Sequence, residues 1–299
     1  MKHAISSPLV SIVTINYNSK KETLELIQSL GKTTYKNWEL IVVDNASKES
    51  PMMDIKKLNP QVTVIESQDN LGFAGGNNLA LSHCSGEYIF FVNNDTELES
   101  DCLTVMVDTA QGLNEKAVIS PKFQFYHSNG LIEYAGSTNI NAFTARNKAV
   151  GRLEKVDKYS GLISTYYAHG GGMLVPRDII KEVGTMEANF FLYYEEMDWC
   201  ERIRRAGYKI YCQRDALIYH KESASVGKMS PLKTYYMNRN RILFMKRNYP
   251  FPKIIPFFMF YSFVSFPKNA MGYLLKGKYK HLRALCRGVF SHVNPNLTY

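Results

Sequence analysis

Short apolar runs alternate with amphipathic segments through the first hundred residues. Four of these runs have the length of buried strands: residues 9–15, 39–43, 62–65 and 88–92. After the first run, apolar residues recur at helical spacing over 24–30, and Ser19 and Glu22 have the spacing of a capping box. Ser50 and Pro51 suit the cap and first turn of a second helix. The pattern predicts an α/β domain with a mixed, mostly parallel sheet flanked by helices.

The second half of the chain has a less regular pattern. Residues 123–167 lack strong periodicity, and we expect them to cover the site or to supply an acceptor loop. Order returns after Gly170, with a strand at 173–175 and a short helix at 177–183. A helix at 197–206 then stops at Gly207. Two short strands are predicted at 209–212 and 216–219.

Polar residues close three of the predicted strands. Asn16, Asp44 and Asp95 each follow an apolar run. In an open doubly wound sheet, the ligand crevice lies beyond the carboxyl ends of the strands. We therefore expect these three side chains to face a common crevice.

Asp95 is the sharpest candidate for a metal ligand. It ends the motif Asn93-Asn94-Asp95, a variant of Asp-x-Asp in which an amide replaces the first acid. A carboxylate at this position can hold a hard divalent cation that also bridges substrate phosphates. The alternative is an ordinary turn, for which this sequence is equally suited.

Two further segments are candidates for nucleotide binding. Asp44 could accept a hydrogen bond from the ring N–H of uracil or thymine, the alternative being that it caps a turn. The glycine-rich segment 69–78 would let the backbone approach a ligand closely. It lacks the lysine and hydroxyl residue of a P-loop and the spacing of a dinucleotide fingerprint.

Acidic residues gather at the start of the helix predicted near 197. Glu195, Glu196 and Asp198 would all stabilise the helix dipole, which is the structural explanation for them. The functional interpretation is that one of them, with Glu196 ranked first, is the general base that accepts a proton from an attacking hydroxyl. His220 follows a predicted strand and is either a metal or phosphate ligand or a structural histidine.

Charge is distributed unevenly along the chain. The formal net charge is +9, yet residues 221–299 hold 14 Lys and Arg against one acid, Glu222. Such a region favours an anionic membrane or nucleic acid, although a solvated helix pair would have the same composition. Five cysteines without a C-x-x-C pair suit free thiols in a reducing compartment, and we expect a cytoplasmic protein.

An aromatic run within this basic region favours the membrane interpretation. Residues 254–266 are apolar and aromatic, with Lys253 and Lys268 beside them. The run is shorter than the roughly 18–20 residues that a spanning helix needs. It fits peripheral docking on the inner leaflet, and the alternatives are packing against the catalytic domain or a homodimer interface. We find no nucleic-acid recognition motif, and Arg239 and Arg241 are candidates for phosphate contacts.

Taken in order, these segments resemble the family-two inverting glycosyltransferases of the GT-A fold, in particular the rhamnosyltransferase-like branch that builds bacterial surface polysaccharides. The resemblance covers roughly residues 8–250 and rests on these segments: 10–18, 42–47, 70–78, 93–95, 195–198 and 202–207. Two positions depart from the family pattern. Asn93 replaces the first acid of the metal motif, and Glu196 stands where the family has an aspartate.

The resemblance implies a role for each motif. Asp44 would bind the pyrimidine base, Asp95 would hold Mg²⁺ or Mn²⁺ with His220, and Glu196 would be the base, with Asp198 as a second catalytic candidate. The other donor-binding residues would be Thr14, Asn16, Asn45, Asn70, Gly75, Asn78 and Asn94.

The expected activity is sugar transfer, with inversion, from dTDP-rhamnose or a UDP-sugar to a glycan or polyprenyl-linked saccharide. A nucleotidyltransferase and a non-catalytic nucleotide-sugar or glycan-binding protein are the alternatives. We expect a GT-A catalytic domain at 1–230, with a nucleotide-binding half at 8–100 and an acceptor half at 101–230. A basic helical region at 231–299 would follow it.

Overall fold

One ten-stranded sheet organises the molecule. The computed structural model describes residues 7–221, 230–294, 296–297 and 299. The strands are β1 (Val10–Asn16), β2 (Trp38–Asp44), β3 (Thr63–Glu66), β4 (Tyr88–Val92), β5 (Thr96–Leu98), β6 (Ala117–Phe125), β7 (Ile132–Tyr134), β8 (Leu162–Ser164), β9 (Gly172–Pro176) and β10 (Lys209–His220). The main order is β3-β2-β1-β4-β9-β6-β10-β5, with β7 beside β6 and β8 beside β10. β3, β2, β1 and β4 are parallel, and β9 is antiparallel to β4.

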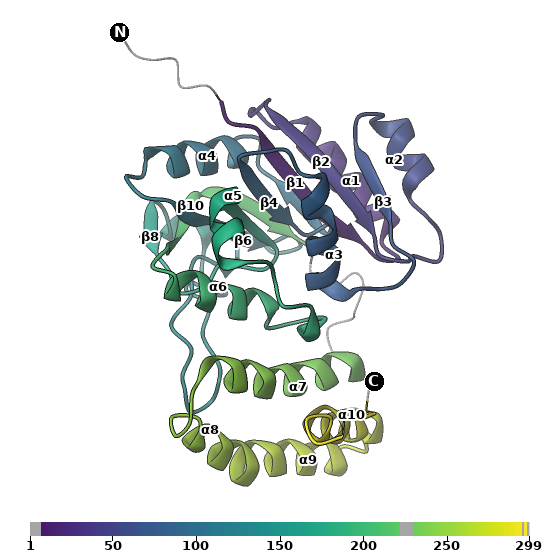
Figure 1. Ribbon diagram of the computed structural model, residues 1–299, viewed down its shortest axis with the longest axis vertical. Coiled ribbons are helices and arrows are strands. Elements are labelled where there is room, and N and C mark those ends of the chain that lie inside the picture. Colours follow the sequence, from purple (N-terminus) through teal and green to yellow (C-terminus); the bar gives the residue numbers. More distant parts are fainter. Residues whose placement is uncertain (1–6, 222–229, 295, 298) are drawn as a thin grey trace.

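Helices cover both faces of this sheet (Figure 1). Those of the sheet domain are α1 (Lys20–Gly31), α2 (Met52–Leu58), α3 (Gly72–Ala80), α4 (Cys102–Gly112), α5 (Arg177–Val183) and α6 (Glu195–Arg205). Alternate residues of a strand point to opposite faces, so Ile12 packs in the core with α1, and Val13 packs in the core with α3 and α6. In the second core, Phe91 meets Trp199 of α6 edge to face at 5.5 Å between ring centroids.

The predicted strands at 9–15, 39–43, 62–65 and 88–92 are confirmed as β1 to β4. The two strands predicted after Gly207 form a single strand, β10, whose register shifts between Gln213 and Leu217. Ser19 precedes α1 as expected, but its side chain makes no capping hydrogen bond, so the predicted capping box does not form.

Most of the glycine-rich segment 69–78 lies in a helix, α3, and its predicted approach to a ligand stays a prediction. Its glycines allow close packing: a Cβ on Gly75 would lie 2.8 Å from the Cβ of Leu71, and one on Gly76 would lie 2.9 Å from the Cδ1 of Ile15. Gly76 therefore lets α3 lie directly against β1, because it has no side chain at the contact with Ile15.

Four helices follow the sheet domain: α7 (Pro231–Asn248), α8 (Ile255–Phe260), α9 (Phe266–Leu275) and α10 (Tyr279–Phe290). A π-helical turn, Tyr261–Ser265, joins α8 to α9. Figure 1 shows α7 between the sheet domain and a layer of α8, α9 and α10. Phe244 and Met245 of α7 belong to the core beneath α6, so α7 is continuous with that core. In the described part of the chain, helices lack the combination of length and hydropathy needed to cross a bilayer.

Candidate active site

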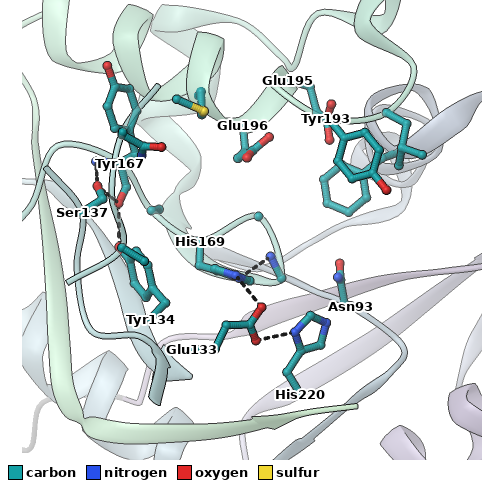
Figure 2. Close-up of a pocket in the computed structure, with 18 of the residues that line it drawn as sticks. Asn93, Glu133, Tyr134, Ser137, Tyr167, His169, Tyr193, Glu195, Glu196 and His220 are labelled. Carbon is teal, nitrogen blue, oxygen red and sulfur yellow. Dashed lines mark hydrogen bonds and ion pairs between the residues drawn. The ribbon is translucent and has the colours of Figure 1, made fainter. Parts of the chain in front are cut away.

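A cavity of about 390 Å³ opens beyond β4 and β10. The residues that line it come from distant parts of the sequence: Asn93 and Asp95 after β4, Glu133 of β7, His169 to Gly171 before β9, Glu195 and Glu196 of α6, and His220 at the end of β10. Figure 2 shows Glu196 on one side of this cavity and the Glu133–His220 pair on the other. The structure therefore brings together the predicted residues Asp95, Glu196 and His220.

Two histidines and two carboxylates form a continuous polar chain along the cavity floor. His220 Nδ1 lies 2.6 Å from Glu133 Oε2, and its Nε2 lies 3.3 Å from Asp95 Oδ1. The other Glu133 oxygen lies 3.7 Å from His169 Nε2. His169 Nδ1 accepts a hydrogen bond from the amide of Gly171, which orients the ring.

The carboxylates set the protonation of this chain. Burial disfavours the charged form of His220, but hydrogen bonds and charge from Asp95 and Glu133 outweigh it and raise the pKa of His220 to about 10. Burial likewise opposes ionisation of Asp95, yet the contact with His220 leaves the pKa of Asp95 below its ordinary value. The pKa of Glu133 is also lowered, because both histidines outweigh its burial.

Asp95 and His220 fit a divalent cation that is shared with a substrate, because such an ion would take the place of the proton on His220 Nε2, which lies 3.3 Å from Asp95 Oδ1. They offer one oxygen and one nitrogen ligand, a set that suits Mn²⁺ and leaves positions for phosphate oxygens and water. Glu133 holds the far nitrogen of His220, as carboxylates do behind metal-bound histidines. Within the described ranges, no cluster of three or more His, Cys, Asp and Glu is arranged to hold a metal.

The two glutamates of α6 are presented by a strained turn. Phe191, Tyr193 and Tyr194 all have positive φ, of 64°, 71° and 74°, a conformation that costs energy for residues other than glycine. Glu196 lines the cavity, and burial raises its pKa. Glu195 is more deeply buried, its Oε2 has no hydrogen-bond partner, and burial and the charge of Glu196 raise its pKa.

The structure separates Asp198 from the cavity, which corrects its assignment as a catalytic candidate. Its carboxylate is 1% exposed and accepts hydrogen bonds from Arg202, Arg247 and Asn248. Positions two apart on a helix face different sides, so Glu196 turns toward the cavity while Asp198 turns toward α7. Asp198 joins α6 to α7.

The residues predicted to bind the nucleotide lie along the ends of β1 and β2, outside this cavity. Asp44 Oδ1 accepts hydrogen bonds from Asn16 at 2.7 Å and from Ser47 at 2.6 Å. Asn16 also accepts one from Thr23, so it positions Asp44 instead of facing a ligand. The Thr14 hydroxyl is buried and has no hydrogen-bond partner among the described residues.

Other predicted donor-binding residues have structural contacts. Asn45 donates to Asn70 and to the carbonyl of Gly72, and so fixes the chain before α3. Asn78 donates to the carbonyl of Met186, and Asn94 donates to Thr23. Gly75 contacts Leu71, as described above. Each of these asparagine side chains donates within the fold, and the assignment of these residues to the donor stays a prediction.

The two arginines of α7 that were predicted to contact phosphates each donate to a backbone carbonyl. Arg239 donates to the carbonyl of Asn189, and Arg241 to that of Thr144. Neither side chain lines the first cavity, whereas Lys233 of the same helix does.

Sequence reasoning missed Glu133, His169, Tyr193 and Lys233, which all line the cavity. Glu133 lies in a three-residue strand within the segment without periodicity. His169 was detectable, since it precedes three consecutive glycines, of which Gly171 is the one that binds its ring.

The chain is similar to several known proteins. A protein of Sinorhizobium fredii, y4gI, is 29% identical over 81% of this chain, which spans only 28% of that protein. The low-salt glycan biosynthesis hexosyltransferase Agl10 of Haloferax volcanii is 26% identical over 78% of this chain and 74% of its own length.

Solved structures have the same fold. Staphylococcus aureus TarS in complex with UDP-GlcNAc matches 96% of this chain and 82% of the TarS fragment, with a TM-score of 0.59 and 16% identity. The mannosyltransferase PcManGT of Pyrobaculum calidifontis, in complex with GDP-Man and Mn²⁺, matches 97% of this chain and 76% of its own, with a TM-score of 0.59 and 14% identity. The predicted GT-A fold is confirmed. Residues 11–184, more than half of the chain, match the model of glycosyl transferase family 2, and the protein belongs to that family.

Proposed function

We propose that this protein is an inverting glycosyltransferase of cell-surface polysaccharide synthesis. It transfers a sugar from dTDP-rhamnose or a UDP-sugar to a glycan or lipid-linked saccharide. The observation that carries the proposal is the position of Glu196, which lines both the cavity described above and a second cavity beside α7. A base at the junction of two cavities can receive a donor from one side and an acceptor from the other.

This arrangement matches a single displacement. A carboxylate within reach of the acceptor hydroxyl removes its proton as the oxygen attacks the anomeric carbon, and one displacement inverts the configuration there. The raised pKa of Glu196 makes it a stronger base than an exposed glutamate.

Asp95 and His220 would hold Mg²⁺ or Mn²⁺ beside the donor diphosphate. When bound, the cation would neutralise the negative charge that develops on the leaving nucleoside diphosphate. Asp44 would select a pyrimidine base through its carboxylate, which Asn16 and Ser47 hold in place.

We also propose that the α8–α9 layer docks on an anionic membrane, where a lipid-linked acceptor would be found. Phe251, Phe263 and Leu275 are about four-fifths exposed, at 81%, 79% and 78%. Lys268 and Lys276, close to them in sequence, are exposed as well. Exposed aromatic side chains with nearby lysines are typical of proteins that lie on an anionic leaflet.

The test is the release of free nucleoside diphosphate from a panel of UDP- and dTDP-sugars, with Mn²⁺ or Mg²⁺ and extracted glycolipid as acceptor. Asp95→Asn should abolish release, and the exposed Asp157→Asn should not. No release from any donor, or equal release by Asp95→Asn, would contradict the proposal.

A further inference from the structure

The second cavity has a volume of about 620 Å³ and lies between the sheet domain and the C-terminal helices. Its wall on the sheet-domain side includes Glu196 and an arm formed by residues 137–149, which reaches the α8 end of the C-terminal layer (Figure 1). Arg146 of the arm, Lys233 and Arg241 of α7, and His281 of α10 also line it.

Positive charge dominates this cavity. Arg146, Lys233 and Arg241 are cationic, and among the described residues that line it Glu196 is the sole acid. Glu196 and Lys233 line both cavities, so the charged residues that line the second cavity alone are Arg146 and Arg241, both cations. Like charges gathered in a partly desolvated space repel each other unless an anion lies between them.

Arg241 shows the imbalance most clearly. It is 3% exposed, and within the described residues no carboxylate is in ion-pair distance of it. Its Nε donates to the carbonyl of Thr144, and its Nη1 donates to the hydroxyl of Ser265 at 3.1 Å. Its Nη2 is buried and has no hydrogen-bond partner. A buried guanidinium is costly without a counter-ion, so these neutral contacts leave its charge uncompensated.

A purely structural role accounts for only part of this arrangement. The guanidinium of Arg241 lies 5.0 Å from the ring centroid of Tyr261, which stabilises the cation and ties α7 to the π-helical turn. This cation–π contact does not explain Arg146, which adds a second positive charge. Burial lowers the pKa of Arg241, and the charge of Arg146 lowers it further. Arg146 itself is exposed on the arm.

We propose that this cavity binds a phosphate or diphosphate group carried by the acceptor. Together, the three cations and the one carboxylate give the cavity a net positive charge that is close in size to the negative charge of a diphosphate. Guanidinium groups bind phosphate oxygens in pairs, which favours this ligand over a single carboxylate. A group held there would leave the sugar of the acceptor near Glu196. That the bound molecule is the acceptor rests on the proposed function, whereas the existence of the anion site does not depend on it.

The test is a direct binding measurement, which requires no sugar transfer. Calorimetric titrations would use geranyl diphosphate, inorganic pyrophosphate and geraniol in metal-free buffer, so that no cation holds a diphosphate on the donor side. We expect both diphosphates to bind with an affinity that falls as salt rises, and geraniol not to bind. Equal affinity for both diphosphates would assign the site to the phosphates alone, and tighter binding of geranyl diphosphate would add a contact with the lipid; both support the proposal.

Arg146→Gln should weaken diphosphate binding by about tenfold, the usual effect of losing one charge-assisted hydrogen bond. Arg283→Gln is the matched control, since Arg283 is exposed on α10 and does not line the cavity. The proposal fails if neither diphosphate binds, if geraniol binds as well as geranyl diphosphate, or if both variants bind alike. Absence of sugar transfer together with Arg146-dependent binding would refute the proposed function and leave the anion site standing.

Discussion

Asn240 of α7 offers a sharp test of how the glutamates of α6 are positioned. Its side chain is fully buried, and its Nδ2 lies 2.7, 2.7 and 2.9 Å from the carbonyl oxygens of Phe190, Leu192 and Tyr193. These carbonyls belong to the strained turn before Glu195. Asn240 therefore holds that turn in place without lining the cavity.

Asn240→Ala removes two N–H donors from buried carbonyls. Each carbonyl left without a donor costs about 1–3 kcal/mol, so we expect a loss of roughly 2–6 kcal/mol in the free energy of unfolding. For a chain of this size, that corresponds to a decrease in Tm of about 3–10 °C. The turn would also relax, and a displacement of about 1 Å at a catalytic group can lower kcat by about 100-fold.

Asn248→Ala is the matched control on the same helix. Asn248 is also buried, but it donates to Asp198 and to the carbonyl of Phe244, away from the cavity. Thermal unfolding and steady-state kinetics should show a comparable loss of stability in both variants and a loss of kcat in Asn240→Ala alone. Equal kcat values, measured at a temperature where both variants are folded, would refute the positioning role.

Three further predictions concern the metal ligands, the base and the C-terminal helices. His220→Ala should weaken Mn²⁺ binding in the presence of UDP by at least about tenfold, as measured by electron paramagnetic resonance, and an unchanged affinity would remove His220 from the metal site. Because burial raises the pKa of Glu196 and only its ionised form acts as a base, kcat/KM should fall with decreasing pH through a midpoint above 4.5; a midpoint at or below 4.5 would contradict this. Gly288→Ala should destabilise the protein, since the new Cβ would lie 2.6 Å from the carbonyl oxygen of Tyr235. Gly272→Ala, also within a helix but in open space, should instead stabilise the protein by up to about 1 kcal/mol in chemical denaturation. Destabilisation by both variants or by neither would refute close packing of α10 on α7.

The sheet was predictable where strands are buried on both faces. β1, β2 and β4 are continuous apolar runs, so their sequence alone identifies them. β6 is equally buried but contains Pro121 and Lys122, which hide it from a hydropathy pattern. The Lys122 ammonium is satisfied by the carbonyls of Val156 and Tyr159, a contact between segments more than thirty residues apart that no local pattern shows.

The candidate site was predictable where a polar residue ends a recognisable element. Asp95 follows β4, His220 lies at the end of β10, and both line the cavity. Acids in the first turn of α6 were recognised as a group, but helix periodicity separates Glu196 from Asp198. Glu133 escaped prediction because its role depends on His220, which lies 87 residues away in the chain.

The glycine-rich segment shows the limit of composition. Its glycines could let the backbone approach a ligand closely, yet in the structure Gly76 lets α3 pack closely on β1. Composition alone does not distinguish close approach to a ligand from close approach to a strand.

The most direct test of the central claim compares Glu196→Gln with Glu195→Gln, because both glutamates line the first cavity and Glu196 alone also lines the second. Sugar transfer and donor binding would be measured for each variant with the donor that the wild-type protein uses. The account predicts that Glu196→Gln binds the donor normally and transfers sugar about 100- to 10,000-fold more slowly, while Glu195→Gln retains most of its activity. Normal transfer by Glu196→Gln together with a loss in Glu195→Gln would contradict it.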